Sequence, residues 1–267
     1  MYPELFRFGD FVISSFGFML VIAFTTGNYL LKRDMIYLKK DPMIAEDLTF
    51  NAALGGILGA KIYYIIENIP SGYGLINLKG LLDIFKGIVT LTPSLIASGI
   101  QNFGAGMVFY GGLIGGTITV SLYIRKHKLD WPVVADWMAP YLALCHAIGR
   151  IGCLLVGDDY GLPTNLPWGI AFPNGLPPVH VPVHPTQIYE FIAYFFSFTY
   201  LYSIRFKKSF NGSQISKYLV LIGISRFLIE FIRVNPKYVI GLSGAQIISL
   251  LMVLIGTIIL IKNPSKK

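Results

Sequence analysis

The chain has 267 residues and a formal net charge of +8; 54% of its residues are hydrophobic and only 13% are charged. Soluble domains carry about 25% charged residues, so this composition excludes an ordinary soluble domain and favours a chain embedded in a membrane. In a soluble protein the positive charge would suggest nucleic acid binding. Here the basic residues lie between apolar segments, so membrane topology explains them and no nucleic acid partner is expected.

The apolar segments predict an all-α membrane protein with about seven transmembrane helices. A span needs about 20 mostly apolar residues. The segments that approach this length are 11–31, 47–66, 104–124, 132–155, 187–205, 217–233 and 241–261. The apolar stretch from Ile88 to Ile100 contains Pro93 and is expected to form a loop or a re-entrant piece. We expect one integral membrane domain over residues 1–267, whose first span is retained because no signal-peptide pattern precedes it.

The placement of basic residues predicts the orientation of these spans. One set of alternate loops, with the C-terminus, holds 14 of the 22 Lys and Arg residues: Lys32, Arg33, Lys39, Lys40, Arg125, Lys126, Lys128, Arg205, Lys207, Lys208, Lys217, Lys262, Lys266 and Lys267. By the positive-inside rule these loops are cytoplasmic, which places the N-terminus outside and the C-terminus in the cytoplasm. The loop 156–186 is then on the outer side.

Small residues recur at a spacing that is typical of close helix packing in membranes. Gly55 and Gly59 form one such pair, and two further pairs lie among Gly111, Gly112, Gly115 and Gly116. Glycines at this spacing let two helix backbones approach closely.

Charged side chains inside apolar segments are the strongest pointers to function. Lys61, Arg150 and Arg226 lie in such segments, where a charge costs at least about 2.5 kcal/mol on insertion scales. In SRFLIEFIR, Arg226, Glu230 and Arg233 are spaced to share one helix face. This face has a net positive charge that suits a phosphate group, because guanidinium forks bind phosphate oxygens. The alternative is an ion cluster that satisfies itself and fixes helix packing.

Two further segments carry polar groups at the outer ends of spans. In LCHAIGRIGC, Arg150 lies near the glycine-rich, anionic turn GDDYG; the alternative is an interfacial arginine that reaches the membrane surface. In HPTQIYE, His184 and Pro185 open the fifth span, although helix capping and anchoring would also explain His184 and Tyr189. Asp136 is expected to be a cap or an interface residue.

No cofactor, metal or disulfide is expected. Cys145 and Cys153 are eight residues apart on one helix, about 12 Å, which is too far for a disulfide. The candidate metal ligands lack a tight ligand spacing; they are Cys145, His146, Cys153, His180 and His184.

Five motifs together resemble the phosphatidylglycerol–prolipoprotein diacylglyceryl transferase family over nearly the whole chain. They are GMVFYGGLIGG (106–116), HAIGRIGCLLVGDDYG (146–161), HPTQIYE (184–190), RFLIEFIR (226–233) and GLSGAQ (241–246). The resemblance implies an enzyme of the bacterial cytoplasmic membrane, with phosphatidylglycerol and the lipobox of a prolipoprotein as partners. In that reaction the lipobox cysteine sulfur attacks the glycerol carbon that bears the phosphate, and glycerol 1-phosphate leaves.

The resemblance also implies roles for individual residues. Arg150, Gly152, Gly161, Arg226 and Glu230 match the family pattern. The expected catalytic residues are Arg150, Arg226, Tyr110 and Asp158. The expected phospholipid-binding residues are Arg150, Arg226, Glu230, Arg233, Gly111, Gly112, Gly152, Gly161, His184 and Gln187.

The chain departs from the family pattern at four positions. Tyr110, Cys153, Asp158 and Phe16 stand where the family has His, Asn, Glu and Tyr respectively. Tyr110 is either a weaker hydrogen-bond donor or base, or a sign of another acceptor or of lost catalysis. Asp158, Asp159, His146 or His184 would then be the alternative base. A transporter with a charged pathway is a third interpretation of the intramembrane charges.

Overall fold

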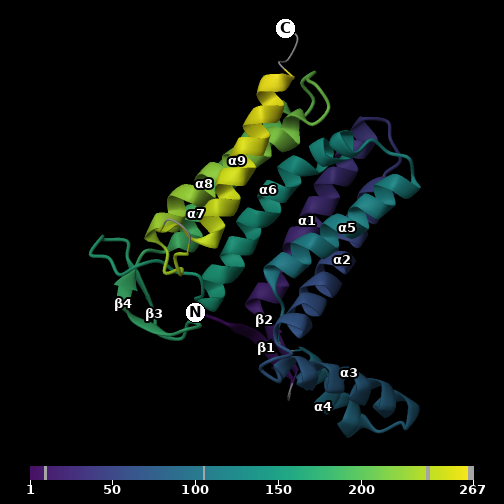
Figure 1. Ribbon diagram of the computed structural model, residues 1–267, viewed down its shortest axis with the longest axis vertical. Helices are drawn as coiled ribbons and strands as arrows, with labels where there is room; N and C mark the ends of the chain where they lie inside the picture. Colours follow the sequence, from purple (N-terminus) through teal and green to yellow (C-terminus); the bar gives the residue numbers. More distant parts are fainter. Residues whose placement is uncertain (9–10, 105, 239–240, 264–267) are drawn as a thin grey trace. The chain divides into compact units, whose positions relative to one another are not determined.

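The computed structural model describes residues 1–8, 11–104, 106–238 and 241–263, and helices dominate these ranges. The helices are α1 (Ser15–Tyr37), α2 (Met43–Glu67), α3 (Tyr73–Val89), α4 (Pro93–Gly104), α5 (Phe109–Lys126), α6 (Trp131–Val156), α7 (Thr186–Ile204), α8 (Ser213–Ile229) and α9 (Gly244–Lys262) (Figure 1). Two antiparallel hairpins accompany them, β1 (Glu4–Phe8) with β2 (Phe11–Ser14) and β3 (Ile170–Phe172) with β4 (Val179–Val183).

Each of the seven segments predicted as spans overlaps one long helix. By length and composition alone, three of the described helices could cross a membrane, namely α2, α6 and α9, and the α4–α5 pair taken together would make a fourth. The expectation of an all-α protein is confirmed for the described residues, in which two short hairpins accompany the helices. Of the two alternatives for residues 88–100, the loop is wrong, because the chain is helical as far as Val89 and again from Pro93. The re-entrant piece stays a prediction. A proline is tolerated in the first turn of a helix, where its missing N–H has no partner to lose.

The described chain separates into two compact units, residues 43–129 and residues 1–42 with 130–267. In the first unit α2 packs along α5, and α3 packs along α4. Glycines set the first of these crossings: a Cβ placed on Gly59 would lie only 2.8 Å from the Cα atom of Gly115. The packing interpretation of these glycines is therefore confirmed.

The second unit is built around α6, which packs against α1, α7 and α8, while α9 packs along α8. Ala139, Ala143 and Ala147 recur every four residues on α6 and are fully buried. They meet a core face made by Tyr194, Leu201, Tyr218 and Ile222 of α7 and α8. The small alanine side chains let the neighbouring helices approach α6 closely.

Asp136 is a cap, but the helix that it caps is not its own. Its carboxylate accepts hydrogen bonds from the backbone N–H groups of Gly212, at 2.8 Å, and Ile215, at 2.9 Å. These groups open α8, whose first N–H groups have no partners within the helix. Asp136 thus fixes the start of α8 against α6, and α8 carries Arg226 toward its other end.

Candidate active site

Three arginines meet one buried carboxylate in the unit built around α6. Glu190 of α7 is fully buried. Its carboxylate lies 2.8 Å from Arg150 Nε of α6 and 3.4 Å from Arg233 Nη1, and it also forms an ion pair with Arg226 of α8. A buried charge is tolerated only with partners, and Glu190 is shared by three cations that arrive from three different segments.

Two further carboxylates complete the network. Glu230 Oε2 lies 2.9 Å from Arg226 Nη2, and Asp159 Oδ2 lies 2.7 Å from Arg150 Nη1. Asp159 Oδ1 also pairs with Arg233. Each arginine therefore shares its carboxylates with another arginine, and none is neutralised by a private partner.

The network is closed on one side and open on the other. The Glu190 and Glu230 side chains are at most 1% exposed, whereas those of Arg150 and Arg226 are about 20% exposed. Arg150 and Arg226 are thus partly accessible above two buried carboxylates, whereas Arg233 is only 4% exposed and Asp159 is 43% exposed. A planar guanidinium has five N–H donors, so an arginine that holds two carboxylates can still bind a phosphate oxygen.

The prediction that Arg226, Glu230 and Arg233 share one helix face is wrong in its geometry. The helix α8 ends at Ile229, a short 3-10 turn follows over Glu230–Ile232, and Arg233 has an extended backbone with φ −93° and ψ 155°. The three side chains still meet, because Arg233 turns back to Glu190 and Asp159 after the helix has ended.

Gly161 holds this turned segment in place. Its N–H donates to the His184 carbonyl at 2.9 Å, and the N–H of Leu162 donates to the Ile232 carbonyl at 2.8 Å. A Cβ on Gly161 would lie 2.5 Å from the Ile232 oxygen and 2.9 Å from the His184 Cβ. Only glycine fits this approach, so Gly161 positions Arg233; its contact with lipid stays a prediction.

Glu230 is held from its other side by the start of α9. Its Oε1 atom accepts hydrogen bonds at 2.7 Å from both Asn235 Nδ2 and Ser243 Oγ. Ser243 also forms a capping box with Gln246, in which each side chain bonds the other residue's backbone N–H. The motif GLSGAQ therefore supports the carboxylate that pairs with Arg226.

The turn after α6 carries two aspartates whose pKa values are shifted in opposite directions. Burial would raise the pKa of Asp159, but Arg233 and Arg150 outweigh this effect and hold its pKa below the usual value. Burial, followed by the neighbouring charge of Asp159, raises the pKa of Asp158. Only Asp158 is thus shifted in the direction that suits a proton acceptor near neutral pH.

Two buried polar side chains of α7 hold the same turn by its backbone. Thr186 Oγ1 donates to the Asp159 carbonyl at 2.6 Å, and Gln187 Nε2 donates to the Asp158 carbonyl. Gln187 was predicted to bind phospholipid, and the structure gives it this positioning contact.

Metal ligation was considered for the group formed by Cys153, Asp158 and Asp159, whose candidate ligand atoms lie within 4.8 Å of one another. Both carboxylate oxygens of Asp159 are engaged by guanidinium groups, one with Arg233 and the other with Arg150. These contacts favour ion pairing over metal ligation at Asp159, because a cation there would have to displace two arginines.

The comparison with known proteins agrees with the motifs. The family model described as prolipoprotein diacylglyceryl transferase matches residues 3–262. The chain belongs to the prolipoprotein diacylglyceryl transferase family.

Three curated relatives carry the name phosphatidylglycerol–prolipoprotein diacylglyceryl transferase. The protein of Clostridium tetani is 34% identical over 96% of this chain and 95% of its own length. The second such transferase of Clostridium perfringens is 36% identical over 93% of this chain and 90% of its own length. The transferase of Leptospira interrogans is 31% identical over 93% of this chain and 88% of its own length.

Cys153 and Phe16, two positions that are expected from the sequence to depart from the family pattern, fall beside the arginine network. Cys153 Sγ lies 3.5 Å from Arg150 Nη1. A Cβ on Gly152 would lie 3.2 Å from the Phe16 ring, so Phe16 of α1 packs directly over the backbone between Arg150 and Cys153. The substitutions are therefore neighbours of the candidate catalytic arginine.

The His184 carbonyl accepts a hydrogen bond from the Gly161 N–H, and the His184 side chain contacts Tyr189, which lines a surface groove. Its Nδ1 atom lies 3.3 Å from the Tyr189 hydroxyl, which also accepts a hydrogen bond at 2.7 Å from Trp168 Nε1. Trp168 and Tyr189 line a mainly apolar groove of about 560 Å³ with Ile188 and Ile192. The anchoring interpretation of His184 and Tyr189 fits these contacts.

The glycine motif of the transferase family lies in the other unit, at the start of α5. Tyr110 is in the first turn of α5 and partly exposed. Gly111 lies against Tyr63 and Gly59, and a Cβ on Gly112 would lie 3.2 Å from the Gly56 carbonyl. Both glycines therefore have a packing role, and their contact with phospholipid stays a prediction, as does the catalytic role of Tyr110.

Glu190 and Asp159 were missed as binding residues. The signal for Glu190 was available, because three arginines in apolar segments require a carboxylate partner and Glu190 is an acidic residue inside the fifth predicted span. Its position six residues after His184 gave no hint that it would meet Arg226, because that contact depends on the packing of α7 against α8.

Proposed function

We propose that this chain transfers the diacylglyceryl group of phosphatidylglycerol to the lipobox cysteine of a prolipoprotein and releases glycerol 1-phosphate. The observation that carries the proposal is the gathering of Arg150, Arg226 and Arg233 around Glu190. Family membership supports the same reaction, because the relatives are named for it.

Positive charge is needed where the leaving group forms. The cysteine sulfur bonds to the glycerol carbon, the bond from that carbon to the phosphate oxygen breaks, and its electron pair leaves with glycerol 1-phosphate. Arg150 and Arg226, the partly exposed arginines, bind the phosphate and stabilise the negative charge that builds up on it. Glu190 keeps the three guanidinium groups together before the lipid arrives.

The thiol must lose its proton before it attacks, because the thiolate is the nucleophile. Asp158 is our first candidate for the base, since burial raises its pKa and its side-chain partner is the Cys153 thiol, whereas the other groups pair with arginines or tyrosines. Asp159 pairs with two arginines, His146 contacts the Tyr218 hydroxyl, and His184 contacts Tyr189. Tyr110 is the second candidate, by its place in the family motif.

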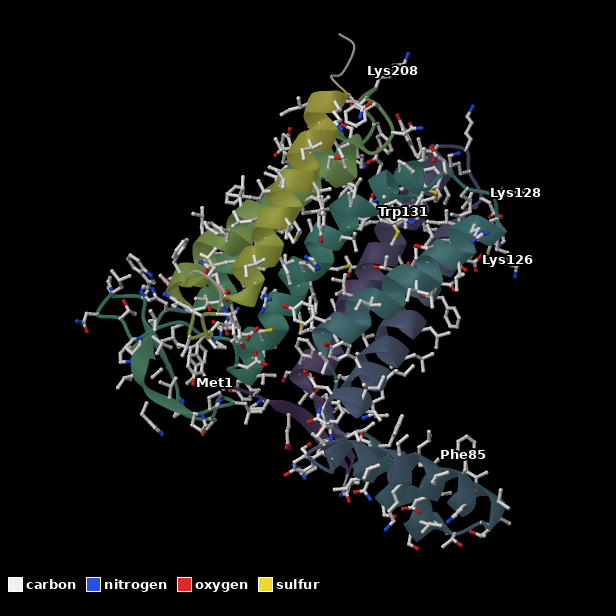
Figure 2. The ribbon with its side chains drawn as sticks, in the orientation of Figure 1. Met1, Phe85, Lys126, Lys128, Trp131 and Lys208 are labelled. Atoms are coloured by element: carbon white, nitrogen blue, oxygen red, sulfur yellow. The ribbon has the colours of Figure 1, made fainter. Side chains whose placement is uncertain are left out.

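We further propose that residues 1–267 form one multi-pass domain of the bacterial cytoplasmic membrane, with seven spans and the N-terminus outside. Each of the seven apolar segments overlaps a helix. Lys126 and Lys128 at the end of α5, and Lys208 between α7 and α8, lie at helix ends (Figure 2), as expected for cytoplasmic loops.

The decisive experiment is a reconstituted transfer assay. Purified full-length protein in detergent, supplied with phosphatidylglycerol and a lipobox peptide, is expected to release glycerol phosphate and to yield a thioether-linked peptide. Arg150→Ala should abolish the release, whereas Arg125→Ala, at the exposed end of α5, should leave it unchanged. Absence of release by the wild-type protein, or equal release by Arg150→Ala, would contradict the proposal.

A second candidate keeps the lipid donor and changes the acceptor. It is favoured by Cys153, which departs from the family pattern and lies 3.5 Å from Arg150. The double variant Tyr110→His, Cys153→Asn separates the two functions. Higher transfer to the lipobox peptide would mean that the chain has drifted from the family reaction, whereas lower transfer would mean that Tyr110 and Cys153 belong to a site for another acceptor.

A further inference from the structure

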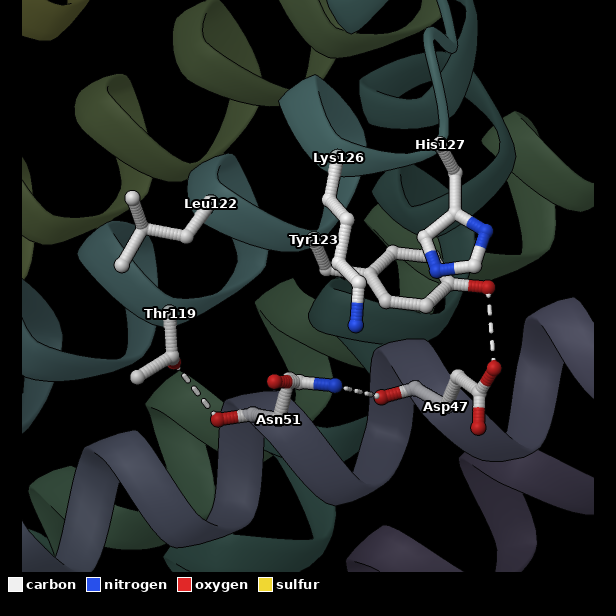
Figure 3. A pocket seen from close by; sticks show the side chains of 7 residues that line it. All are labelled: Asp47, Asn51, Thr119, Leu122, Tyr123, Lys126 and His127. Carbon is white, nitrogen blue, oxygen red and sulfur yellow. Dashed lines mark hydrogen bonds between the residues drawn. The ribbon is translucent and has the colours of Figure 1, made fainter.

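A polar cavity lies at the Lys126 end of α5, within the unit formed by residues 43–129. It has a volume of about 380 Å³ and lies between α2 and α5 (Figure 3). The residues that line it are Asp47, Asn51, Thr119, Leu122, Tyr123, Lys126 and His127. None of them has a role in the transfer reaction described above.

The floor of the cavity is fixed by two hydrogen bonds between the helices and one within α2. Tyr123 OH donates to Asp47 Oδ2 at 3.0 Å, and Thr119 Oγ1 donates to the Asn51 carbonyl at 2.7 Å. Asn51 Nδ2 donates to the Asp47 carbonyl at 2.8 Å. The cavity is therefore preorganised, because its polar walls are held by the protein itself.

The Lys126 ammonium points into the cavity, and the His127 imidazole lies near it. Figure 3 shows the Lys126 ammonium turned toward Asn51, with His127 beside it. The His127 ring stacks on Tyr123 with ring centroids 4.3 Å apart. Among the described residues, Lys126 has no hydrogen-bond or ion-pair partner, so its charge is available to an anion.

The surface next to the cavity is apolar along both helices. Leu122 lines the cavity and is exposed, and Ile118 lies one turn earlier on α5, also exposed. On α2, exposed Leu54 and Leu58 continue the face that begins with Asp47 and Asn51. An ammonium and an imidazole at the end of α5, beside apolar faces, match a phospholipid. Its phosphate would meet Lys126 and His127, while its acyl chains follow the apolar faces.

We propose that this cavity binds the headgroup of a membrane phospholipid, with Lys126 and His127 on the phosphodiester. The site would be separate from the arginine network and would hold a lipid that is not consumed. Asp47 lines the opposite wall, and its carboxylate accepts hydrogen bonds and repels an anion. The ligand must therefore also carry a hydrogen-bond donor. A headgroup that carries hydroxyl or ammonium donors beyond its phosphate satisfies both walls.

The test counts lipids bound to the full-length protein by native mass spectrometry after delipidation and titration with dioctanoyl phosphatidylglycerol. Wild-type protein should bind two lipids, and Lys126→Gln should bind one of them about tenfold more weakly, which corresponds to about 1.4 kcal/mol. Lys128→Gln is the matched control, because Lys128 lies in the same exposed turn but does not line the cavity. Its affinity should equal that of the wild-type protein.

Two probes identify the ligand chemistry. Dioctanoyl phosphatidylmethanol has the same phosphodiester charge without a donor and should bind the cavity more weakly, and excess inorganic phosphate should not displace the lipid. Equal weakening in Lys126→Gln and Lys128→Gln, no weakening in either, or displacement by inorganic phosphate would each overturn the proposal. Arg226→Gln should remove the other lipid, which binds at the arginine network. If Arg226→Gln still binds both lipids, the proposed reaction is contradicted and the cavity proposal is unaffected.

Discussion

At the scale of single residues, Glu190 is the position on which the arginine network depends. It is fully buried and pairs with three guanidinium groups. We expect Glu190→Gln to lower the free energy of unfolding by about 3 kcal/mol, because removal of one partner leaves buried charges uncompensated. Thermal unfolding in detergent measures this loss. Glu67→Gln, at the exposed end of α2, is the control, and equal unfolding midpoints for the two variants would refute the role of Glu190.

Arg226 tests whether the shape of the cation matters as well as its charge. Its Nη1 atom pairs with Glu190 and its Nη2 atom with Glu230, a bridge that the single ammonium of lysine does not reproduce. Arg226→Lys should reduce the transfer rate about 100-fold, the usual cost of one lost transition-state donor. The assay is glycerol phosphate release, with Arg125→Lys as control. A rate within about twofold of the wild-type rate would show that charge alone is sufficient.

The aspartates of the turn after α6 should respond to pH in opposite ways. The pKa of Asp159 is lowered because Arg233 and Arg150 outweigh burial, so its ionised form stabilises the fold above about pH 4, and this contribution is lost on acidification. The pKa of Asp158 is raised by burial and by Asp159, so its contribution is present at low pH and is lost as the pH rises through the raised pKa.

These shifts predict different outcomes for two matched variants. At about pH 7, Asp159→Asn should lower the unfolding temperature, and its difference from the wild-type protein should shrink toward about pH 3. Asp158→Asn should not lower it at about pH 7, because it removes an unfavourable charge. The measurement is the unfolding midpoint across that pH range, and the same sign for both variants at about pH 7 would refute the assignment.

At the scale of elements, the crossing of α2 and α5 depends on glycine at specific positions. A Cβ on Gly59 would lie 2.8 Å from the Gly115 Cα, whereas a Cβ on Gly56, one turn away on the same helix, would meet only the Gly112 carbonyl at 3.8 Å. Gly59→Ala should therefore destabilise the protein by about 1–3 kcal/mol through overpacking. Gly56→Ala should be neutral or stabilising by up to about 1 kcal/mol, because alanine favours a helix.

The unfolding midpoints of Gly59→Ala and Gly56→Ala, each made in the wild-type protein, measure this difference in stability. If Gly56→Ala destabilises as much as Gly59→Ala, general sensitivity of α2 to substitution would explain the result and close packing at Gly59 would not. Tyr110 lies in the first turn of α5, so its position depends on the same crossing of α2 and α5.

The end of α8 shows how an element boundary shapes a site. A continuous helix through residue 233 would carry Arg233 along the α8 axis, but the helix stops at Ile229 and the chain turns back through Glu230–Ile232. The bridge between Gly161 and Arg233 then joins this turn to the loop after α6. The boundary is set by contacts from other segments, including Ser243 and Asn235 on Glu230.

At the scale of the whole molecule, the distribution of basic loops predicts which ends of the spans face the cytoplasm. Asn174, between β3 and β4, and Ser209, between α7 and α8, are exposed and belong to loops of opposite predicted sides. In intact cells, Asn174→Cys should react with a membrane-impermeant maleimide. Ser209→Cys should react only after permeabilisation, and the protein with only its native cysteines gives the background, since Cys153 is buried and Cys145 is partly so. The reverse pattern would invert the proposed topology.

The sequence by itself determined the class of the protein, most of its helices and its two central arginines. Apolar length and the scarcity of charge are local properties, so they reveal helices such as α6 and α9 without knowledge of their neighbours. Arg150 and Arg226 stood out because a charge in an apolar segment is costly wherever the segment packs. The two hairpins and α3 gave weaker signals, because short strands and a short glycine-containing helix depend on tertiary contacts.

Only the tertiary structure decided how these parts make a site. The contact between Glu190 and Arg226 joins residues 36 positions apart, and the contact between Gly212 and Asp136 joins residues 76 apart. Such pairs have no local signature, because desolvation and charge pairing act between whichever groups packing brings together. For the same reason the cost of a charge at Arg150 could be predicted from the sequence, but the carboxylates that it shares could not.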